Sequence, residues 1–570
     1  MKYSKRYLVL TIILLAAVFL KFNTFGQDYA QIDNFRGGNL EPEVWNPLVA
    51  NEINSKGMTL IIDNKEYKSD SVHFYMDENR NIMVPVSILR DALNCSAHIY
   101  ENTQLLVEKH NLSVRFFLDE NRALTGEEEF AVQSALKKAE DEYYVSINDL
   151  SGLLQYSWNF DIKNRTMVTA DTSESTSNLP VKYDLREKGR ISQIRDQGAY
   201  GTCWAFAAIS ALESSLLPEE SPAFSVDHMS LSNSFHVSQQ DGGEYTMGMA
   251  YLAAWQGPVY EADDPYGDGE SDAALAPVRH VQEMRIIDGK DYEGIKTAVF
   301  KYGGVESSLY STIKSSQSSS PYYDKANKAY CYIGTEKPNH DVVIIGWDDT
   351  YPKENFPVPL EGDGAFICQN SWGEGFGDGG IFYVSYYDTN IGTHNVVYTR
   401  VEDTDNYDHI YQSDLCGWVG QMGYDEREQI FGANVFKAEG DEEIAAASFY
   451  ATGAGTSYQL YVVKNYKDEG SFASRQLMAE GTLTQAGYYT IDFETPVSVS
   501  KDERYAIVLY VSTPGSTHPM AIEYDSGDAL MESVDLTDGE GYISYNGIKF
   551  VNVKSKNDCN LCIKAFTNNR

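Results

Sequence analysis

The part of the chain beyond residue 400 consists of short aromatic and β-branched runs separated by glycine and polar turns. Runs such as "SFYAT", "SYQLYVV", "YYTIDF" and "RYAIVLYV" are typical of strands, and no long segment with the helical period of 3.6 residues interrupts them. This spacing predicts an all-β sandwich over residues 399–570. Aromatic side chains of such a sandwich offer surfaces that stack on sugars, although Tyr and Phe in strands more often belong to the core.

The middle of the chain has a different pattern. The segment "CWAFAAISALESSLL" begins at Cys203 and carries apolar residues at 205, 206, 208, 209, 212 and 216, a spacing that predicts a buried helix. A chain of 570 residues that combines this helix with the strand-rich tail is expected to form several domains, and its apolar content of 42% is enough for real cores.

The N-terminus has the layout of a secretory signal. Lys2, Lys5 and Arg6 precede 14 uncharged, mostly apolar residues, Tyr7 to Leu20, and small residues at Thr24 and Gly26 offer a cleavage site. We therefore expect a signal peptide over 1–26 and a secreted or cell-surface protein. A permanent membrane anchor is the alternative, but the apolar run is shorter than the roughly 20 residues that a membrane span needs.

A weak internal repeat follows the signal. Residues 84–107 align without a gap with residues 145–168, and each copy has the pattern of a strand end, a short helix, a strand, a turn and a strand. The pattern resembles the copper amine oxidase N-terminal-like module of exported bacterial proteins, and it implies no copper or oxidase chemistry. We assign this α+β module, or an unspecified α+β pro-region, to residues 27–170. The apolar-free segment "DTSESTSN" within 171–179 is the linker and a candidate site of proteolytic maturation.

Composition excludes some functions. The formal net charge is −38, from 45 Lys and Arg against 83 Asp and Glu, so the chain should repel phosphate backbones and no nucleic-acid partner is expected. Seven cysteines are too few for a disulfide scaffold. Cys559 and Cys562 form a lone "CNLC", which is half a zinc site or a redox pair in a functional interpretation. Because no second cysteine pair lies nearby, a local disulfide or two buried thiols is the favoured interpretation. We expect no metal and no cofactor.

Cys203 allows several interpretations, because a cysteine there is a buried small hydrophobe, half of a disulfide, a metal ligand or a nucleophile. A helix N-terminus favours the thiolate, and a thiolate nucleophile needs an imidazole and a group that orients it. His340 in "KPNHDVVIIGWDD" precedes an apolar strand pattern, and Asn370 in "CQNSWGEGFGDGG" precedes a glycine-rich turn. Taken singly, such residues are usually structural.

Three blocks together resemble a known family. "DQGAYGTCWAFAA", "NHDVVIIGW" and "CQNSWGEGFGDGGIFYVSY" look like the sequence blocks of papain/cathepsin-type cysteine peptidases, in the order Cys, His, Asn. His340 follows Cys203 by 137 residues, within the ~130–150 expected for the family's downstream partners. The resemblance covers 180–398 and implies an α+β peptidase with a helical half and a β-barrel-like half. "QQDGGEY" and "GPVYEADDPY" resemble the family's glycine pair and its Pro-Tyr block, and the tail resembles the lectin-like domain that accompanies some of these peptidases.

The resemblance assigns roles to individual positions. It makes Cys203 the nucleophile, paired as thiolate with the imidazolium of His340, which acts first as general base and then as general acid. Asn370 holds the imidazole through its side-chain oxygen, and Trp372 shields that hydrogen bond at the edge of the substrate site. Gln197 aims its side-chain amide at the developing oxyanion, beside the Cys203 N–H. Gly242 and Gly243 present bare backbone to an extended substrate.

The chain departs from the family at several positions. Tyr200 and Gln240 stand where the family has a disulfide beside the nucleophile, so we expect packing to hold the site instead. Thr202 replaces the usual Ser or Ala. Asp341, after the histidine, replaces a small apolar residue in the pocket for the second residue before the scissile bond, and we expect it to favour polar or basic side chains there.

The predicted function is a secreted cysteine endopeptidase that acts on polypeptides through an acyl-enzyme. One alternative is a cell-surface binding protein that attaches to wall or glycan through its flanking domains, with the peptidase secondary. Another is a transpeptidase, in which the acyl group passes to an amine. The N-terminal module is a candidate inhibitor, because no long helical pro-peptide pattern precedes residue 180.

Overall fold

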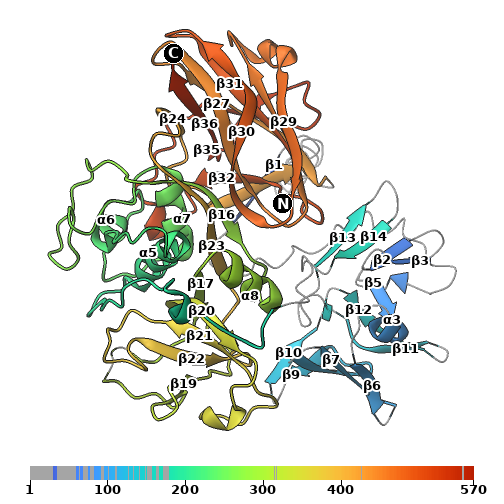
Figure 1. Cartoon of the computed structure of the whole chain (residues 1–570). Coiled ribbons are helices and arrows are strands. Elements are labelled where there is room, and N and C mark those ends of the chain that lie inside the picture. Colours follow the sequence, from blue (N-terminus) through green and yellow to red (C-terminus); the bar gives the residue numbers. More distant parts are fainter. Residues whose placement is uncertain are drawn as a thin grey trace, which may run out of the picture.

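The structure is a computed structural model in which three regions follow one another along the chain (Figure 1). It describes residues 179–570 apart from 314, 316, 425–426 and 555–556. Before residue 179 it describes separate stretches: 30–34, 59–62, 65–68, 75–76, 82–91, 96–100, 102–109, 112–125, 128–132, 134–139, 142–147, 149–150, 157–161 and 166–170. The predicted signal peptide (1–26) and the linker segment 171–178 lie outside the described residues.

The N-terminal module is an α+β unit, as the repeat predicted. Its first copy contains β5 (Ile82–Pro85), α3 (Val86–Asp91), β6 (Ser96–Tyr100) and β7 (Gln104–Lys109), and its second contains β12 (Glu142–Ser146), β13 (Ser157–Asp161) and β14 (Thr166–Ala170). The equivalent strands β5 and β12 pair with each other, antiparallel, so the two copies share a sheet. The other strands are β2 (Thr59–Ile62), β3 (Lys65–Lys68), β4 (Tyr75–Met76), β8 (Leu112–Phe117), β9 (Arg122–Thr125), β10 (Glu128–Ala131) and β11 (Lys137–Ala139).

The helical half of the region 179–402 is built around α5 (Cys203–Leu216), with α6 (Val226–Leu231) and α7 (Tyr245–Ala253) against it. Residues 204–214 of α5 are all buried, because alanine and aromatic residues cover every side of the helix. The prediction of a buried helix starting at Cys203 is therefore confirmed. Before α5 the chain forms β15 (Lys182–Asp184) and the short 3-10 helix η1 (Leu185–Lys188).

The second half is a barrel-like sheet that is antiparallel except for one short parallel pairing. Its strands are β16 (His280–Ile286), β17 (Val305–Leu309), β18 (Tyr323–Asp324), β19 (Ala329–Tyr330), β20 (His340–Asp348), β21 (Ala365–Gln369), β22 (Ile381–Ser385) and β23 (Asn395–Glu402), with α8 (Tyr292–Lys301) packed against β20 and β17 and η2 (Lys353–Asn355) in a loop. The central strand β20 pairs with both β17 and β21 and is buried along its whole length. The start of β20 faces α5, and this contact brings the two halves together.

The C-terminal region is the predicted all-β sandwich. One layer contains β24 (His409–Tyr411), β25 (Gly420–Tyr424), β27 (Glu442–Ala451), β30 (Ala486–Val499), β32 (Met520–Tyr524), β35 (Cys559–Leu561) and β36 (Ile563–Asn569). The other contains β26 (Gln429–Lys437), β28 (Thr456–Val463), β29 (Gln476–Leu483), β31 (Arg504–Ser512), β33 (Gly541–Ser544) and β34 (Val551–Asn552), with η3 (Glu469–Ser474) and η4 (Ala529–Met531) in loops. Inward-facing side chains of both layers form one core. A separate strand, β1 (Ala30–Asn34), pairs with the β25 edge.

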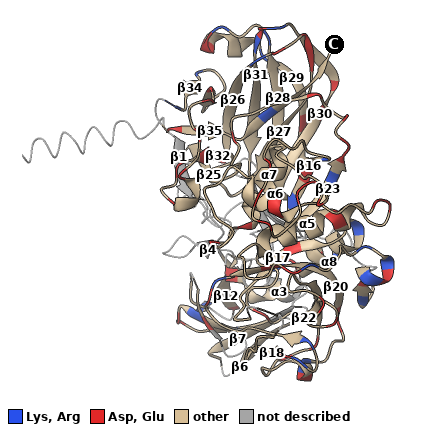
Figure 2. Cartoon of the chain, turned by 90° about the vertical axis from the view of Figure 1, so that its left-hand side faces the viewer, with Lys and Arg blue, Asp and Glu red and all other residues tan. Residues whose placement is uncertain are grey.

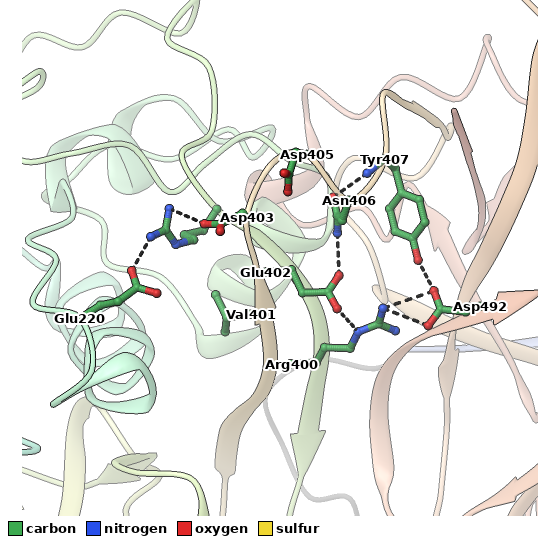
Figure 3. A pocket seen from close by; sticks show the side chains of 10 residues that line it. Glu220, Arg400, Val401, Glu402, Asp403, Asp405, Asn406, Tyr407 and Asp492 are labelled. Atoms are coloured by element: carbon green, nitrogen blue, oxygen red, sulfur yellow. Dashed lines mark hydrogen bonds and ion pairs between the residues drawn. The ribbon is translucent and has the colours of Figure 1, made fainter. Parts of the chain in front are cut away.

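The region 179–402 and the sandwich share hydrogen-bonded structure. Strand β16 pairs with β23 and also with β30 of the sandwich, so one sheet runs through both regions. A polar cavity of about 520 Å³ lies beside this junction (Figure 3). Arg400 of β23 bonds Glu402 and Asp492, whose carboxylate belongs to β30, and Arg279 bonds Glu220 and Asp403. None of the predicted catalytic residues lines this cavity.

In the view of Figure 2, acidic residues are spread over both the region 179–402 and the sandwich. This distribution agrees with the large negative charge of the whole chain. No helix among the described residues is long and apolar enough to cross a membrane.

Candidate active site

Cys203 occupies the first position of α5, as the sequence predicted. The backbone N–H groups of Asp341 and Trp204 lie near its thiol and act to lower the thiol pKa, against the larger effect of burial. This places the nucleophile candidate beside β20, because Asp341 is the second residue of that strand and follows His340 directly. Cys203 is half-buried, whereas the other described cysteines, at 331, 368, 416, 559 and 562, are buried.

His340 and Asn370 meet at one edge of the barrel. The strands β20 and β21 are antiparallel neighbours, so the start of one and the end of the other lie at the same end of their ladder. The His340 Nε2 and Asn370 Oδ1 atoms are 2.8 Å apart. Since an amide oxygen only accepts, Nε2 carries the proton and Nδ1 is the nitrogen left to take a proton from the thiol. The Ser371 N–H also donates to Asn370 Oδ1, at 2.8 Å, and fixes the orientation of the amide.

Trp372 covers this pair. Its ring stacks on the His340 imidazole with a centroid distance of 4.5 Å and an interplanar angle of 18°. Trp372 and His340 are each 6% exposed, so the indole ring keeps most water away from the hydrogen bond between His340 and Asn370. Hydrogen bonds strengthen in such surroundings because little water competes for the donor and the acceptor.

Gln197 lies on the loop before α5, and its side chain is held at both ends. The Ser371 hydroxyl donates to Gln197 Oε1 at 2.6 Å, and Gln197 Nε2 donates to the Tyr200 carbonyl at 2.7 Å. The first bond decides which end of the amide is the nitrogen. An amide nitrogen has two protons, so Nε2 keeps a second proton for an acceptor outside the loop.

Backbone contacts replace the disulfide that Tyr200 and Gln240 cannot form. The Gly201 N–H donates to the Gln239 carbonyl at 2.7 Å. A Cβ at Gly201 would lie 2.9 Å from the backbone of Gly242, so only glycine allows the two loops to approach this closely. The expectation that packing alone holds the site was incomplete, because hydrogen bonds carry much of the connection.

The glycine pair lies beside the nucleophile helix. Gly242 has a φ of +87°, which other residues rarely adopt, and a Cβ at Gly243 would overlap the Trp204 indole nitrogen. Gly243 is therefore required by packing against α5 whatever its part in substrate binding.

Asp341 carries a buried carboxyl group beside Cys203. The Ser308 hydroxyl donates to Asp341 Oδ1 at 2.6 Å, and the residue is 8% exposed. Burial raises the pKa of the Asp341 carboxyl to about 6, the Ser308 bond opposes that rise, and the charge of Glu244 adds to it. The pocket beside the nucleophile therefore holds a carboxylate at neutral pH and a neutral acid below about pH 6.

Burial acts on the catalytic pair in opposite directions. It raises the pKa of the Cys203 thiol to about 12, with a further rise from the nearby Asp341 charge, and it lowers the pKa of His340 to about 4 against the favourable bond to Asn370. Each group taken alone is thus neutral near pH 7. A thiolate–imidazolium pair at this site depends on the attraction between its two charges and on the N–H groups at the start of α5.

Sequence patterns did not single out Ser371, Ser308 or Tyr266. Ser371 lies inside the quoted block "CQNSW" and Tyr266 ends "DDPY", so both were visible but carried no assigned role. Ser308 lies in "VESSLY", where nothing in the sequence marks its contact with Asp341. Among the described residues, no group of three or more His, Cys, Asp or Glu side chains is placed to hold a metal ion.

A cysteine at the start of a buried helix, beside a histidine that an asparagine orients under a tryptophan, defines a cysteine peptidase domain of the papain type. Comparisons with known proteins agree with this class. Residues 179–400 match the papain family cysteine protease profile, residues 410–567 match a lectin like domain, and residues 61–169 match a copper amine oxidase N-terminal domain.

Individual relatives fall in the same class. Cathepsin S of Bos taurus is 28% identical over 230 residues, 39% of this chain and 64% of the relative, and cathepsin K of Mus musculus is 27% identical over 219 residues, 37% and 61%. The chain therefore spans about 60% of the length of these relatives. The cysteine protease and lectin-like domains of Cwp84, a surface layer associated protein of Clostridium difficile, match with a TM-score of 0.60 and 26% identity over 69% of this chain and 90% of that one.

Proposed function

We propose that the chain is a secreted cysteine endopeptidase that hydrolyses peptide bonds through an acyl-enzyme on Cys203. The observation that carries the proposal is the hydrogen bond between His340 and Asn370 under the Trp372 ring. The Cys203 thiol lies beside the backbone N–H of Asp341, the residue that follows His340. Export is supported by the signal-like N-terminus, and the surface-layer association of Cwp84 favours the same location.

In the first step, Cys203 loses its proton to His340 Nδ1 and the sulfur attacks the carbonyl carbon of the scissile bond. Nε2 stays protonated against Asn370, so the imidazolium is oriented to return the proton from Nδ1 to the leaving amine. The developing oxyanion is stabilised by the Cys203 N–H and the second proton of Gln197 Nε2. Water then attacks the thioester, with His340 as general base, and releases the acid.

The substrate is an extended polypeptide. Gly242 and Gly243 border the nucleophile without side chains, and this leaves room for backbone to run alongside. Asp341, with Glu244 as a second negative charge nearby, favours a lysine or arginine two residues before the scissile bond. A peptide library that selected large apolar residues at that position would contradict this preference.

A labelling experiment tests the proposal. Iodoacetamide at limiting concentration, followed by peptide mapping, is expected to modify Cys203 before the buried cysteines, and hydrolysis of casein or a fluorogenic Lys-containing peptide should fall in step with the labelling. Hydrolysis that persists after complete modification of Cys203 would exclude the acyl-enzyme. Addition of an amine nucleophile distinguishes hydrolysis from transpeptidation, because a transpeptidase transfers the acyl group to the amine in preference to water.

The flanking regions support a second role. The similarity of residues 410–567 to a lectin like domain favours attachment to cell-surface glycan, with the peptidase held at the wall. Binding of the protein to purified wall polysaccharide, and its loss on competition with soluble sugars, would test this role. Comparison of the full chain with one lacking residues 27–178 on a small peptide tests whether the N-terminal module inhibits the site, because equal activity excludes inhibition.

A further inference from the structure

We propose that the Tyr266 hydroxyl is a positioning group for catalysis, because it joins the two ends of the loop that carries both oxyanion donors. The loop runs from Gln197, whose side chain is one donor, to Thr202, whose neighbour Cys203 supplies the other. Tyr266 touches neither the substrate nor the reacting atoms. The inference rests on the proposed peptidase function and adds a residue to it.

Two hydrogen bonds define the contact. The Tyr266 hydroxyl donates to the Gln197 carbonyl at 2.9 Å and lies 2.7 Å from Thr202 Oγ1. A carbonyl only accepts, so the single Tyr266 proton is committed to Gln197, and the Thr202 hydroxyl must donate to the Tyr266 oxygen. The result is a directed chain from Thr202 through Tyr266 to Gln197, in which each bond polarises the next.

The Thr202 hydroxyl does not cap the helix that follows it. Thr202 is the N-cap of α5, where a threonine side chain normally accepts a hydrogen bond from a backbone N–H of the first helical turn. It makes no such bond. Its hydroxyl instead faces Tyr266, and the residue is completely buried at 0% exposure. The Thr202 hydroxyl is therefore used for the contact with Tyr266 rather than for capping α5.

The rest of the loop explains why this link matters. The Gln197 N–H and side chain are anchored to Ser371 on the barrel side of the cleft. The carbonyl of Gln197 is anchored through Tyr266 to Thr202, on the helical side. With Tyr200 and Gln240 in place of a disulfide, no covalent bond fixes the spacing between Gln197 and the start of α5.

The ring of Tyr266 is placed independently of its hydroxyl. It packs edge-on against Phe206 of α5 at a centroid distance of 4.8 Å and against Tyr200 at 6.4 Å. Burial raises the pKa of the Tyr266 phenol to about 12, so the hydroxyl keeps its proton throughout the working range of a peptidase. A phenylalanine at this position preserves the packing and removes only the two hydrogen bonds.

The test separates oxyanion stabilisation from thiol reactivity. Tyr266→Phe is expected to lower kcat by about 5-fold with little change in KM, since one hydrogen bond is worth about 1 kcal/mol and 1.36 kcal/mol is a factor of ten. The affinity for a peptide aldehyde, which forms an oxyanion-bearing adduct with the thiol, should fall by a similar factor. The rate of alkylation of Cys203 by iodoacetamide, and its pH dependence, should stay unchanged because alkylation forms no oxyanion.

Matched variants give the controls. Thr202→Val removes the same hydrogen-bond chain from its other end, so it should reproduce the loss, and the double variant should be no worse than either single one. In a Gln197→Ala background, Tyr266→Phe should cost much less than in the wild type. Tyr351→Phe removes a comparable bond, from Tyr351 to the Asn327 carbonyl, at a distance from the site and should leave kcat unchanged.

Different results overturn different statements. Equal losses of aldehyde affinity and of alkylation rate in Tyr266→Phe, or no loss of either, would overturn the positioning role while the peptidase function stands. A wild-type protein that hydrolyses no peptide would contradict the proposed function. Aldehyde binding, measured as protection of Cys203 from iodoacetamide, would still decide the role of Tyr266 in that case.

Discussion

The two halves of the region 179–402 hold their candidate catalytic residues by different means. On the barrel side, His340 is paired in register with Leu309 of β17, and Asn370 directly follows a strand paired with β20. On the helical side, Cys203 begins α5, but Gln197 lies on a loop that is held by a few single hydrogen bonds. The comparison teaches that a backbone ladder fixes the strand that carries His340, whereas single hydrogen bonds fix the side chain of Gln197.

The largest effect is expected when one of the two proposed reacting groups is removed, either Cys203 on the helical side or His340 on the barrel side. Cys203→Ala and His340→Ala should each lower kcat/KM by about 10⁴-fold or more, and the double variant should be no worse, because the two residues act as a unit. Rates on a fluorogenic peptide measure this. A residual activity that differs widely between the two variants would mean that the halves do not share one reaction.

Gln197→Ala should have the next largest effect and lower kcat by about 10²–10³-fold, because one oxyanion donor is lost. The helical side should otherwise be intact, so alkylation of Cys203 should continue at the wild-type rate. Unchanged kcat would show that Gln197 is a loop anchor only, and that the oxyanion is stabilised elsewhere.

Asn370→Ala tests whether the β20 ladder alone keeps the His340 side chain in its working orientation. If the β20 ladder already fixes the His340 backbone, loss of the amide frees only the ring, and kcat should fall by about 10²-fold through misorientation. Alkylation of Cys203 should slow as well, since a misplaced imidazole no longer takes the thiol proton. That last result distinguishes Asn370→Ala from Gln197→Ala.

The smallest expected effect concerns the pocket between the halves. The pKa of Asp341 is raised to about 6, so its carboxylate is present above that pH and is lost as the pH falls through it. The ratio of kcat/KM for a peptide with lysine at the second position before the scissile bond to that for one with leucine should drop several-fold, by about 5 to 10 times, from pH 7.5 to pH 5.

The ratio removes the effect of Cys203 and His340 titration, because that titration changes kcat/KM for both substrates alike. Asp341→Asn should give a ratio that is low and independent of pH over the same range. A ratio that stays constant in the wild type would show that Asp341 does not meet the substrate.

Much of this architecture was visible in the sequence because it depends on local patterns. The apolar spacing after Cys203 predicted α5, the strand runs beyond residue 400 predicted the sandwich, and the resemblance grouped Cys203, His340 and Asn370 across 167 positions. The contacts of Tyr266, Ser308 and Ser371 were not predictable in this way. Each joins residues far apart in the chain through a single hydroxyl, and a hydroxyl has no periodic signal.

The sequence alone determined which chemistry is available: a thiol at a helix start, an imidazole and an amide in the order of a known family, and a carboxyl group beside them. Tertiary structure alone decided what state those groups are in. Burial raises the pKa of Asp341 and Cys203 and lowers that of His340, and it does so because segments from both halves exclude water from the same small volume. It also decided that a tyrosine hydroxyl joins Gln197 to the start of α5, because only folding brings Tyr266 between Gln197 and Thr202.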